Sequence, residues 1–231
     1  MRIKRLSLVE GAREARGLTV IIDVFRAFTT DAFVMANGAE TIHPVLTVEE
    51  ARELRRLHPD WLLMGEREGI KVEGFDHGNS PHEIRDVDFT GRTLIQTTGS
   101  GTRGIVNASG ADEIILGSFV MAEAIVAYIR EADPEIVSIV AMGWNGNYPA
   151  IEDELCAEYL EGRLRGQPQD FGEMRRRIRE DPQGAKFFDP SKPQFVEGDL
   201  HAAMDLDRFS FVLRVVKGEH LRVEKVAVNA E

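Results

Sequence analysis

Short hydrophobic runs of strand-forming residues alternate with segments of helical periodicity along the first two thirds of the chain. Such short hydrophobic runs are typical of buried strands. The runs that fit are Thr19–Asp23, Leu62–Gly65, Thr93–Thr97, Glu113–Leu116 and Val137–Met142. The segments with helical character are Ala51–Leu57, Phe119–Arg130 and Ile151–Leu164, the first of them preceded by a capping box at Thr47–Glu50. This alternation predicts an α/β fold in which a mostly parallel β-sheet is flanked by helices.

The last third of the chain has a different pattern. Asp170–Asp181 is a charged stretch of helical character, and its arginines at Arg175–Arg179 fit a solvated helix face. Two apolar runs flank a turn-like tetrapeptide and predict a closing β-hairpin; the three segments are Phe209–Val216, Lys217–His220 and Leu221–Val228. No long flexible linker separates the parts. We therefore expect a single domain over residues 1–231, with residues 166–231 as a carboxyl-terminal elaboration.

The composition limits the classes of partner. Hydrophobic residues make up 43% of the chain and charged residues 29%, with a formal net charge of −11. An acidic surface of this kind repels nucleic acid, so no nucleic-acid partner is expected. Cys156 is the single cysteine, which excludes an internal disulfide and a thiolate zinc cage. No run reaches the roughly 20 apolar residues that span a bilayer, and Met1–Gly17 lacks the apolar stretch of a signal peptide, so we expect a cytoplasmic protein without a membrane partner.

Clusters of charged, hydroxylated and small residues follow the predicted strands. They are Asp23–Thr30, Gly65–Lys71 and Thr97–Arg103. Each cluster brings a cation together with hydrogen-bond donors at the start of a predicted helix or tight loop, where unpaired backbone N–H groups favour negative charge. In parallel sheets, ligands bind outside the carboxyl ends of the strands. The residues expected to converge there on a small polyanion are Asp23, Glu66, Thr98 and Gly143.

The spacing Gly99-x-Gly101-x-x-Gly104 resembles a dinucleotide-binding fingerprint. That fingerprint requires an acidic residue about 20 positions later, at the end of the next strand, but Glu113–Leu116 is followed by glycine and serine. Arg103 and the neighbouring threonines suit a phosphate or carboxylate better than a ribose. We interpret the segment as an anion-binding loop, and a dinucleotide-dependent oxidoreductase is the alternative from another class.

Covalent catalysis has little support in the sequence. Aspartyl-phosphate enzymes need a second acid two residues after the nucleophile, and the residue two positions after Asp23 is Phe25. Cys156 lacks the closely spaced arginine of phosphocysteine enzymes and is typical of a core residue. The remaining candidates for the chemistry are carboxylates at predicted strand ends, in loops and at a helix start. They are Asp23, Glu66, Asp76, Glu152 and Asp153. Their oxygens suit Mg²⁺, although an acidic pair is also favoured at any helix amino terminus.

Taken together, the motifs resemble the 2-phosphosulfolactate phosphatase family in order and spacing; they are Ile22–Thr30, Gly65–Arg67, Gly74–Pro81, Thr97–Arg103, and Glu152–Asp153 followed by Cys156–Ala157. The resemblance covers about residues 18–165. It implies a magnesium-dependent phosphatase that hydrolyses 2-phospho-3-sulfolactate to 3-sulfolactate and phosphate by metal-assisted attack of water. This reaction is a step toward coenzyme M in methanogens and toward sulfolactate in some bacteria. The expected partner is a small anionic phosphorylated substrate, and a homo-oligomer is compatible with the sequence.

The resemblance also implies roles for residues at the motif positions. The expected catalytic groups are Asp23, Glu66 and Asp76. The expected metal ligands are Asp23, Glu152 and Asp153. Because the substrate carries phosphate, carboxylate and sulfonate, several cations and donors are expected beside the metal. The expected substrate-binding residues are Arg26, Thr29, Thr30, Arg67, Lys71, Asn79, Ser80, Thr98, Ser100, Gly101, Thr102 and Arg103.

The chain departs from the family pattern in the glycine-containing loop. Relatives usually have Thr-Asn-Gly-Thr-Arg-Ala where this chain has Gly99–Gly104, so Ser100 replaces an amide side chain. Phe25 and Phe28 replace residues that are often smaller. A phosphatase for another small phosphorylated hydroxy acid is therefore the first alternative. A non-catalytic anion-binding protein is a further one, but such a protein has no need for carboxylates beside its cations.

Overall fold

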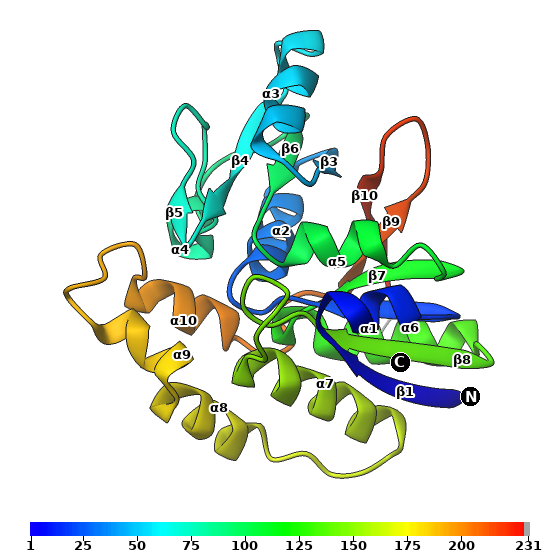
Figure 1. Cartoon of the computed structure of the whole chain (residues 1–231). Helices are drawn as coiled ribbons and strands as arrows, with labels where there is room; N and C mark the ends of the chain where they lie inside the picture. The colour runs from blue at the N-terminus through cyan, green and yellow to red at the C-terminus, as the bar shows by residue number, and fades with distance from the viewer. Residues whose placement is uncertain (229–231) are drawn as a thin grey trace.

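The structure is a computed structural model that describes residues 1–228 (Figure 1). In this part of the chain, ten strands form a sheet in the order β1-β8-β2-β7-β9-β10-β3-β6-β4-β5. The strands are β1 Arg2–Ser7, β2 Leu18–Ile22, β3 Thr41–Pro44, β4 Leu62–Arg67, β5 Ile70–Lys71, β6 Thr93–Thr97, β7 Glu113–Gly117, β8 Ile136–Ala141, β9 Phe211–Val216 and β10 Arg222–Ala227. Every residue of β2 is buried, as is typical of a strand covered on both faces.

Helices flank the sheet. They are α1 Leu8–Glu14, α2 Ala27–Ala36, α3 Val48–Leu57, α4 Pro81–Ile84, α5 Gly101–Asn107, α6 Ala122–Ala132, α7 Ile151–Leu164, α8 Phe171–Glu180, α9 Pro182–Ala185 and α10 Glu197–Ala203, with 3₁₀ turns η1 Phe119–Met121 and η2 Lys186–Phe188. Helix α1 packs against α5, and α6 packs against α7. Between residues 1 and 228, none of the helices has the length and apolar character needed to cross a bilayer.

The predicted α/β class is confirmed, and several elements have the predicted bounds. Strand β6 and helix α7 begin and end at the predicted residues. The capping box before α3 is present, since Thr47 accepts a hydrogen bond from the amide of Glu50 and the Glu50 side chain accepts one from the amide of Thr47. The sequence did not indicate β1 or β3. Strand β1 is a mostly exposed edge strand rich in charge, and β3 is short and ends in proline, so neither has a hydrophobic pattern to read.

The sheet contains two parallel groups of strands that run in opposite directions. One group is β1-β8-β2-β7 and the other is β3-β6-β4. The predicted hairpin is confirmed as β9–β10, but it lies between these groups rather than at an edge, and it pairs antiparallel on both sides. Three successive antiparallel pairings reverse the strand direction. In a flat sheet, the carboxyl ends of the two groups would therefore lie at opposite edges.

In the described part of the chain, a single residue pair, Val223 with Ile42, joins β10 to β3. In Figure 1 the β3-β6-β4 group stands at a steep angle to the other group, and the loops after β2, β4, β6 and β8 meet between them. Helix α5 follows β6 of one group and packs on β2 of the other. The expected convergence of polar strand ends therefore depends on a turn in the sheet and not on one parallel edge.

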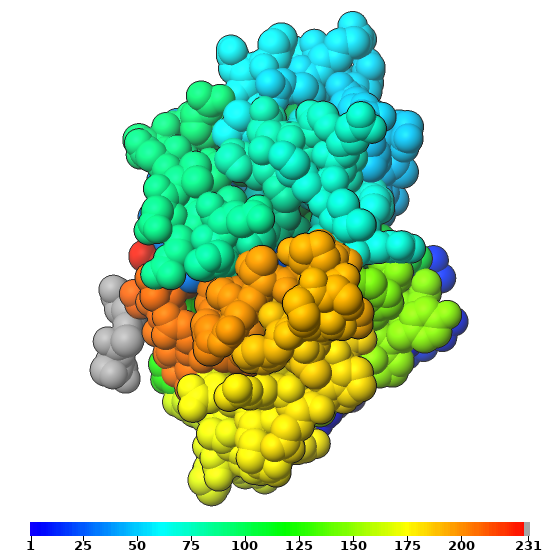
Figure 2. Space-filling view, turned by 90° about the vertical axis from the view of Figure 1, so that its left-hand side faces the viewer, coloured from blue at the N-terminus to red at the C-terminus, as the bar shows by residue number. Residues whose placement is uncertain are grey.

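The carboxyl-terminal third returns across this meeting point. Helix α8 is the predicted charged helix; it is capped by Asp170, and Arg175, Arg176, Arg177 and Arg179 are exposed. After α8, the chain continues through α9, η2 and α10, and α10 packs on α4. Figure 2 shows the segment around residues 190–200 (orange) lying directly against the segment around residues 65–80 (teal). This return brings residues of the last third to the site.

Candidate active site

The loop between β2 and α2 places Asp23 among the converging strand ends. Its side chain is 5% exposed, and Oδ1 accepts a hydrogen bond from the amide of Ala27 at 3.2 Å. The amide of Gly101, at the start of α5, also favours the ionised form of this carboxylate. Burial, and then the nearby charge of Glu66, raise the pKa of Asp23 from 3.8 to about 7. A carboxyl group with this pKa exchanges its proton readily near neutral pH, which suits a catalytic base.

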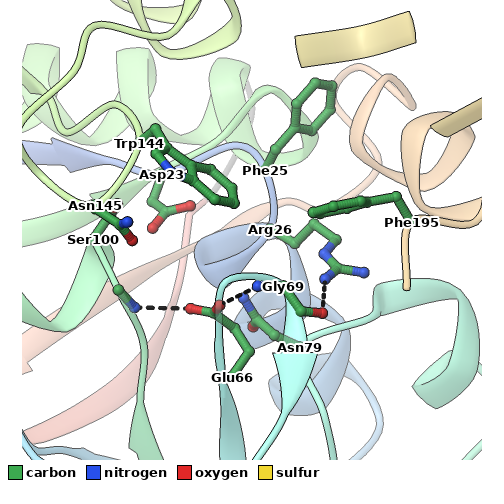
Figure 3. Close-up of a pocket in the computed structure, with 11 residues that line it drawn as sticks. Asp23, Phe25, Arg26, Glu66, Gly69, Asn79, Ser100, Trp144, Asn145 and Phe195 are labelled. Carbon is green, nitrogen blue, oxygen red and sulfur yellow. Dashed lines mark hydrogen bonds between the residues drawn. The ribbon is translucent and has the colours of Figure 1, made fainter. Parts of the chain in front are cut away.

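Glu66 lies at the end of β4 and holds two loops (Figure 3). Its Oε1 accepts a hydrogen bond from the amide of Gly99 at 2.8 Å, and its Oε2 accepts one from the amide of Gly69 at 2.7 Å. Gly69 has a φ of +81°, a conformation that glycine adopts at little cost. The amide of Gly99 thus binds Glu66, and Gly101, which was predicted to bind the substrate, lies against Asp23.

A small pocket lies between the carboxylates of Asp23 and Glu66 and an aromatic wall formed by Phe25, Trp144 and Phe195 (Figure 3). Its volume is about 20 Å³, which leaves room for about one water molecule. A phosphorylated three-carbon acid therefore enters only when part of the lining moves. The lining residues are Asp23, Phe25, Arg26, Glu66, Gly69, Asn79, Gly99, Ser100, Trp144, Asn145 and Phe195.

Helix α7 begins with two buried carboxylates in different surroundings. Asp153 accepts hydrogen bonds from the amides of Val24 at 2.8 Å and Gly143 at 2.7 Å, so it ties the loops after β2 and β8 together. Glu152 is 3% exposed, and its Oε2 has no hydrogen-bond partner within residues 1–228. Burial raises the pKa of Glu152 from 4.5 to about 7 and also raises the pKa of Asp153. Of the two, Glu152 has an oxygen available for a ligand.

Buried acidic side chains outnumber buried basic ones around the pocket. Over residues 1–228, the buried Asp, Glu, Arg and Lys side chains are Asp23, Asp31, Arg26, Glu66, Glu152, Asp153, Lys186 and Asp199. They form one electrostatic network, since each acts on or pairs with another member. Buried charges are costly unless they are neutralised. Six carboxylates beside two basic groups therefore require bound protons, a bound cation or both.

The buried carboxylates around the pocket are the candidate ligands for a metal ion. The described residues contain no cluster of three or more His, Cys, Asp or Glu side chains arranged to hold a metal. Mg²⁺ does not need such a cage, because it is commonly held by one or two carboxylates together with substrate phosphate and water. Asp23 and Glu152 act on each other electrostatically, and both retain acceptor capacity. Asp23 and Glu152 are therefore the residues that would hold a Mg²⁺ ion.

Arg26 lines the pocket, but its charge is already balanced. Nη1 lies 2.6 Å from Oδ2 of Asp199, and the two side chains are 4% and 0% exposed. Arg26 also donates hydrogen bonds to the carbonyl oxygens of Gln194 at 2.9 Å and Gly69 at 2.8 Å. Ser80 donates to the other oxygen of Asp199 at 2.6 Å. The predicted substrate-binding residues Arg26 and Ser80 thus anchor the returning carboxyl-terminal segment beside the pocket.

The predicted hydroxyl donors are engaged within the protein. Thr98 and Thr102 each accept a hydrogen bond from the other's amide, at 3.3 Å and 3.2 Å. Thr29 and Thr30 donate to main-chain carbonyl oxygens at 2.9 Å and 2.8 Å. Ser100 lines the pocket, but its Oγ donates to the carbonyl oxygen after β8 at 2.6 Å. These hydroxyls fix the geometry of the site.

Asn79 differs from the hydroxyl residues. It lines the pocket, and its side-chain Oδ1 is buried without a hydrogen-bond partner in the described residues. Buried polar atoms in native proteins are nearly always satisfied. Asn79 is therefore available to a ligand or a water molecule in the pocket.

The glycine spacing has a packing reason. A Cβ atom on Gly101 would lie 2.9 Å from the Phe28 ring and 3.0 Å from an oxygen of Asp23. A Cβ atom on Gly104 would lie 2.6 Å from Cγ2 of Ile21. Both glycines allow α5 to approach α2 and β2 closely, so their spacing is accounted for without a dinucleotide.

Three predicted cations do not line the pocket. Arg67 donates to Oγ1 of Thr97 at 2.9 Å and braces the ends of β4 and β6. Arg103 donates to the carbonyl oxygen of Asn145 at 2.6 Å and holds the loop after β8. Lys71 is exposed on β5. Arg67 and Arg103 therefore support the pocket from outside it.

Asp76 also lies apart from the pocket. Its side chain is 36% exposed and pairs with Arg55 at 2.9 Å. The same oxygen accepts a hydrogen bond from the amide of Leu63 at 2.8 Å. These contacts hold the loop after β5 against β4 and α3. Asp76 does not line the pocket with Asp23 and Glu66.

Sequence reasoning missed several residues that surround the pocket. They are Trp144, Asn145, Lys186, Phe195 and Asp199. Trp144 and Asn145 follow a predicted strand whose end was expected at the site, so the signal for them was present. Lys186, Phe195 and Asp199 lie in the last third of the chain, where no strand end or motif marks them.

Comparison with known proteins gives a consistent result. The sequence profile of the family described as 2-phosphosulpholactate phosphatase matches residues 5–188. A protein of Bacillus subtilis named probable 2-phosphosulfolactate phosphatase is 31% identical over 216 residues, which cover 91% of this chain and 92% of that protein. Proteins with the same name from Caldicellulosiruptor saccharolyticus and Clostridium acetobutylicum are 42% and 40% identical over 145 and 142 residues. These two matches cover 61% of this chain and 60% of each relative's length.

Proposed function

The chain belongs to the 2-phosphosulpholactate phosphatase family, and on this premise we propose that it hydrolyses 2-phospho-3-sulfolactate to 3-sulfolactate and phosphate with Mg²⁺. The substrate is taken from the names of the family and its relatives. The reaction class has independent support in the pocket, where carboxylates and aromatic side chains enclose a space beside Asp23.

One observation carries the proposal: Asp23 and Glu152 are buried, interact electrostatically, and have pKa values raised to about 7. Burying two ionised carboxylates in one network is costly, and a bound cation would offset that cost. A divalent cation held by them would compensate their charge, and it would also attract a phosphorylated acid into a site that is otherwise acidic. When bound, Mg²⁺ would stabilise charge on the phosphoryl oxygens and favour deprotonation of water.

The protein's own groups have distinct tasks in this reaction. Asp23 and Glu152 would hold the metal, and Asp153 fixes the start of α7 by accepting hydrogen bonds from the amides of Val24 and Gly143. Glu66 fixes the two glycine loops and faces the same space as Asp23. The proton of the attacking water passes to one of the two carboxylates that line the pocket, Asp23 or Glu66. It is returned to the leaving hydroxyl oxygen of 3-sulfolactate as the bond from phosphorus to that oxygen breaks. Phe25, Trp144 and Phe195 limit the water in the pocket, which strengthens electrostatic interactions inside it.

The test is release of phosphate from purified protein. The substrates are 2-phosphosulfolactate, phospholactate, phosphoglycerate and an aryl phosphate, each with Mg²⁺ and with a chelator. Asp23→Asn and Glu152→Gln serve as variants that keep shape and remove charge. The proposal expects Mg²⁺-dependent release, fastest from 2-phosphosulfolactate, and a loss of at least about a hundredfold in either variant.

Other outcomes assign other functions. Preferential release from phospholactate or phosphoglycerate would indicate a phosphatase for another hydroxy acid. Binding of these acids without release would indicate a non-catalytic anion-binding protein. Tight binding of a nicotinamide dinucleotide without phosphate release would indicate the oxidoreductase alternative.

A further inference from the structure

Lys186 lies next to the pocket, in the turn η2 of the returning carboxyl-terminal segment. Its Nζ is 4.5 Å from the centroid of the Trp144 ring and 4.5 Å from the centroid of the Phe195 ring. Both rings line the pocket. The residue itself is only 8% exposed. The ammonium group thus packs on two aromatic rings of the pocket.

The ammonium group has more donors than partners. A lysine ammonium has three N–H donors, and Nζ makes one hydrogen bond, to Oε1 of Gln183 at 2.7 Å. Within residues 1–228 it forms no ion pair, although Glu152 and Asp23 are near enough to act on it electrostatically. A buried ammonium group with unused N–H donors and no ion pair destabilises the folded state. The two aromatic faces compensate part of this cost.

Admission of a substrate would change the surroundings of Lys186. The pocket has room for about one water molecule, so a phosphorylated acid needs part of the lining to shift, and Trp144 and Phe195 belong to that lining. Nζ packs on both of these rings. A shift of either ring would bring the unused N–H donors of Nζ within reach of the bound acid. Arg26, the other buried cation, stays paired with Asp199.

We infer that Lys186 binds an anionic oxygen of the substrate and is the specificity-determining cation of this site. The inference rests on the proposed function only in taking the ligand to be a phosphorylated acid with a second anionic group. The oxygen belongs either to the phosphate or to the carboxylate or sulfonate, and the chemistry is the same in each case: a charge-assisted hydrogen bond from an ammonium group. A purely structural lysine would instead serve only to neutralise Glu152 and Asp23.

Binding measurements separate these roles without requiring turnover. Calorimetry in the presence of Mg²⁺ measures the affinity of inorganic phosphate and of 3-sulfolactate for the wild type, Lys186→Met and Lys192→Met. Lys192 belongs to the same segment, but it is exposed and pairs with Asp189, so its variant controls for the change in net charge. Lys186→Met should weaken one or both probes by roughly ten- to a hundredfold, the loss expected for a hydrogen bond to a charged group. Lys192→Met should leave both affinities unchanged.

The two probes identify the oxygen that Lys186 binds. Weaker binding of phosphate alone assigns Lys186 to the phosphate group, and weaker binding of 3-sulfolactate alone assigns it to the carboxylate or sulfonate; either result supports the inference. Unchanged affinity for both probes in a folded Lys186→Met protein overturns it, as does failure of the wild type to bind either probe. If Lys186→Met does not fold, Lys186→Gln replaces it, because its amide can keep the hydrogen bond to Gln183 while removing the charge.

The outcome is independent of the proposed reaction. A wild-type protein that binds phosphate through Lys186 but does not hydrolyse 2-phosphosulfolactate would contradict the proposed function and leave this inference intact. If the wild type hydrolyses 2-phosphosulfolactate and Lys186→Met has the same KM, the proposed function is supported and this inference is contradicted.

Discussion

The Arg26 guanidinium and the Asp199 carboxylate form a buried ion pair at 2.6 Å, between residues 173 positions apart in the chain. The pair connects the loop after β2 to helix α10. Arg26 also donates to the carbonyl oxygens of Gln194 and Gly69, so one side chain joins three segments around the pocket. The pair fixes the carboxyl-terminal segment over the strand ends where Asp23 and Glu66 lie.

We predict that breaking this pair destabilises the protein strongly. Arg26→Met leaves the carboxylate of Asp199 buried without its cation, and such changes lower the free energy of unfolding by about 3–5 kcal/mol. Arg165→Met, which removes an exposed pair with Glu161, should cost less than about 1 kcal/mol. Urea unfolding of the two variants measures both values. If Arg26→Met with Asp199→Asn is no more stable than Arg26→Met alone, the stranded charge is not the cause.

The raised pKa values of Asp23 and Glu152 predict how stability depends on pH. Both are about 7 in the folded protein, above the ordinary values of 3.8 and 4.5, so the folded state favours the protonated forms. Their contribution to stability is present below about pH 4 and is lost as pH rises through about 7. Without Mg²⁺, the melting temperature should therefore fall more steeply from pH 5 to pH 8 in the wild type than in Asp23→Asn.

The same carboxylates predict that Mg²⁺ acts more strongly at higher pH. Metal binding competes with protons for Asp23 and Glu152, so affinity rises as these groups ionise. The rise in melting temperature on adding Mg²⁺ should be larger at pH 8 than at pH 5, and it should be smaller in Glu152→Gln. An equal rise at both pH values would argue against these two residues as the ligands.

Sequence patterns identified those parts of the fold that local interactions determine. The bounds of β6 and α7 and the capping box at Thr47 follow from hydrophobic spacing and from a cap within a few residues. The reversal of strand direction and the position of the β9–β10 hairpin inside the sheet depend on pairing between distant strands. No local pattern encodes that pairing.

The same distinction applies to the site. Asp23 and Glu66 are at predicted strand ends, and both line the pocket. Sequence position did not indicate that the charge of Arg26 is taken by Asp199, or that Lys186 returns to the pocket from the last third of the chain. Both facts depend on where the carboxyl-terminal segment packs, which is a tertiary property.

We predict opposite effects for the two adjacent acids of α7. Asp153→Ala removes the acceptor of two buried amides, those of Val24 and Gly143, and should lower the free energy of unfolding by about 2–5 kcal/mol. Glu152→Gln removes a buried charge whose Oε2 has no partner in the described residues, so its stability without Mg²⁺ should equal or exceed that of the wild type. Its Mg²⁺-dependent activity should nevertheless be lost. Chemical unfolding and phosphate release distinguish the two, and a destabilised Glu152→Gln protein would contradict the prediction.

The aromatic wall predicts a change in substrate preference. Phe195 is 8% exposed and packs on Arg26 and Lys186, with its ring lining the pocket. Phe195→Ala should open the pocket, so that kcat/KM for a bulky aryl phosphate rises relative to that for 2-phosphosulfolactate by roughly tenfold, within the range that pocket size alone supplies. Phe188 is close in sequence, but it is 36% exposed and does not line the pocket, so Phe188→Ala should leave this ratio unchanged. The ratio of the two kcat/KM values is the measurement, since loss of overall activity through weaker folding affects both substrates equally. An unchanged ratio in Phe195→Ala would mean that this ring does not limit access to Asp23 and Glu66.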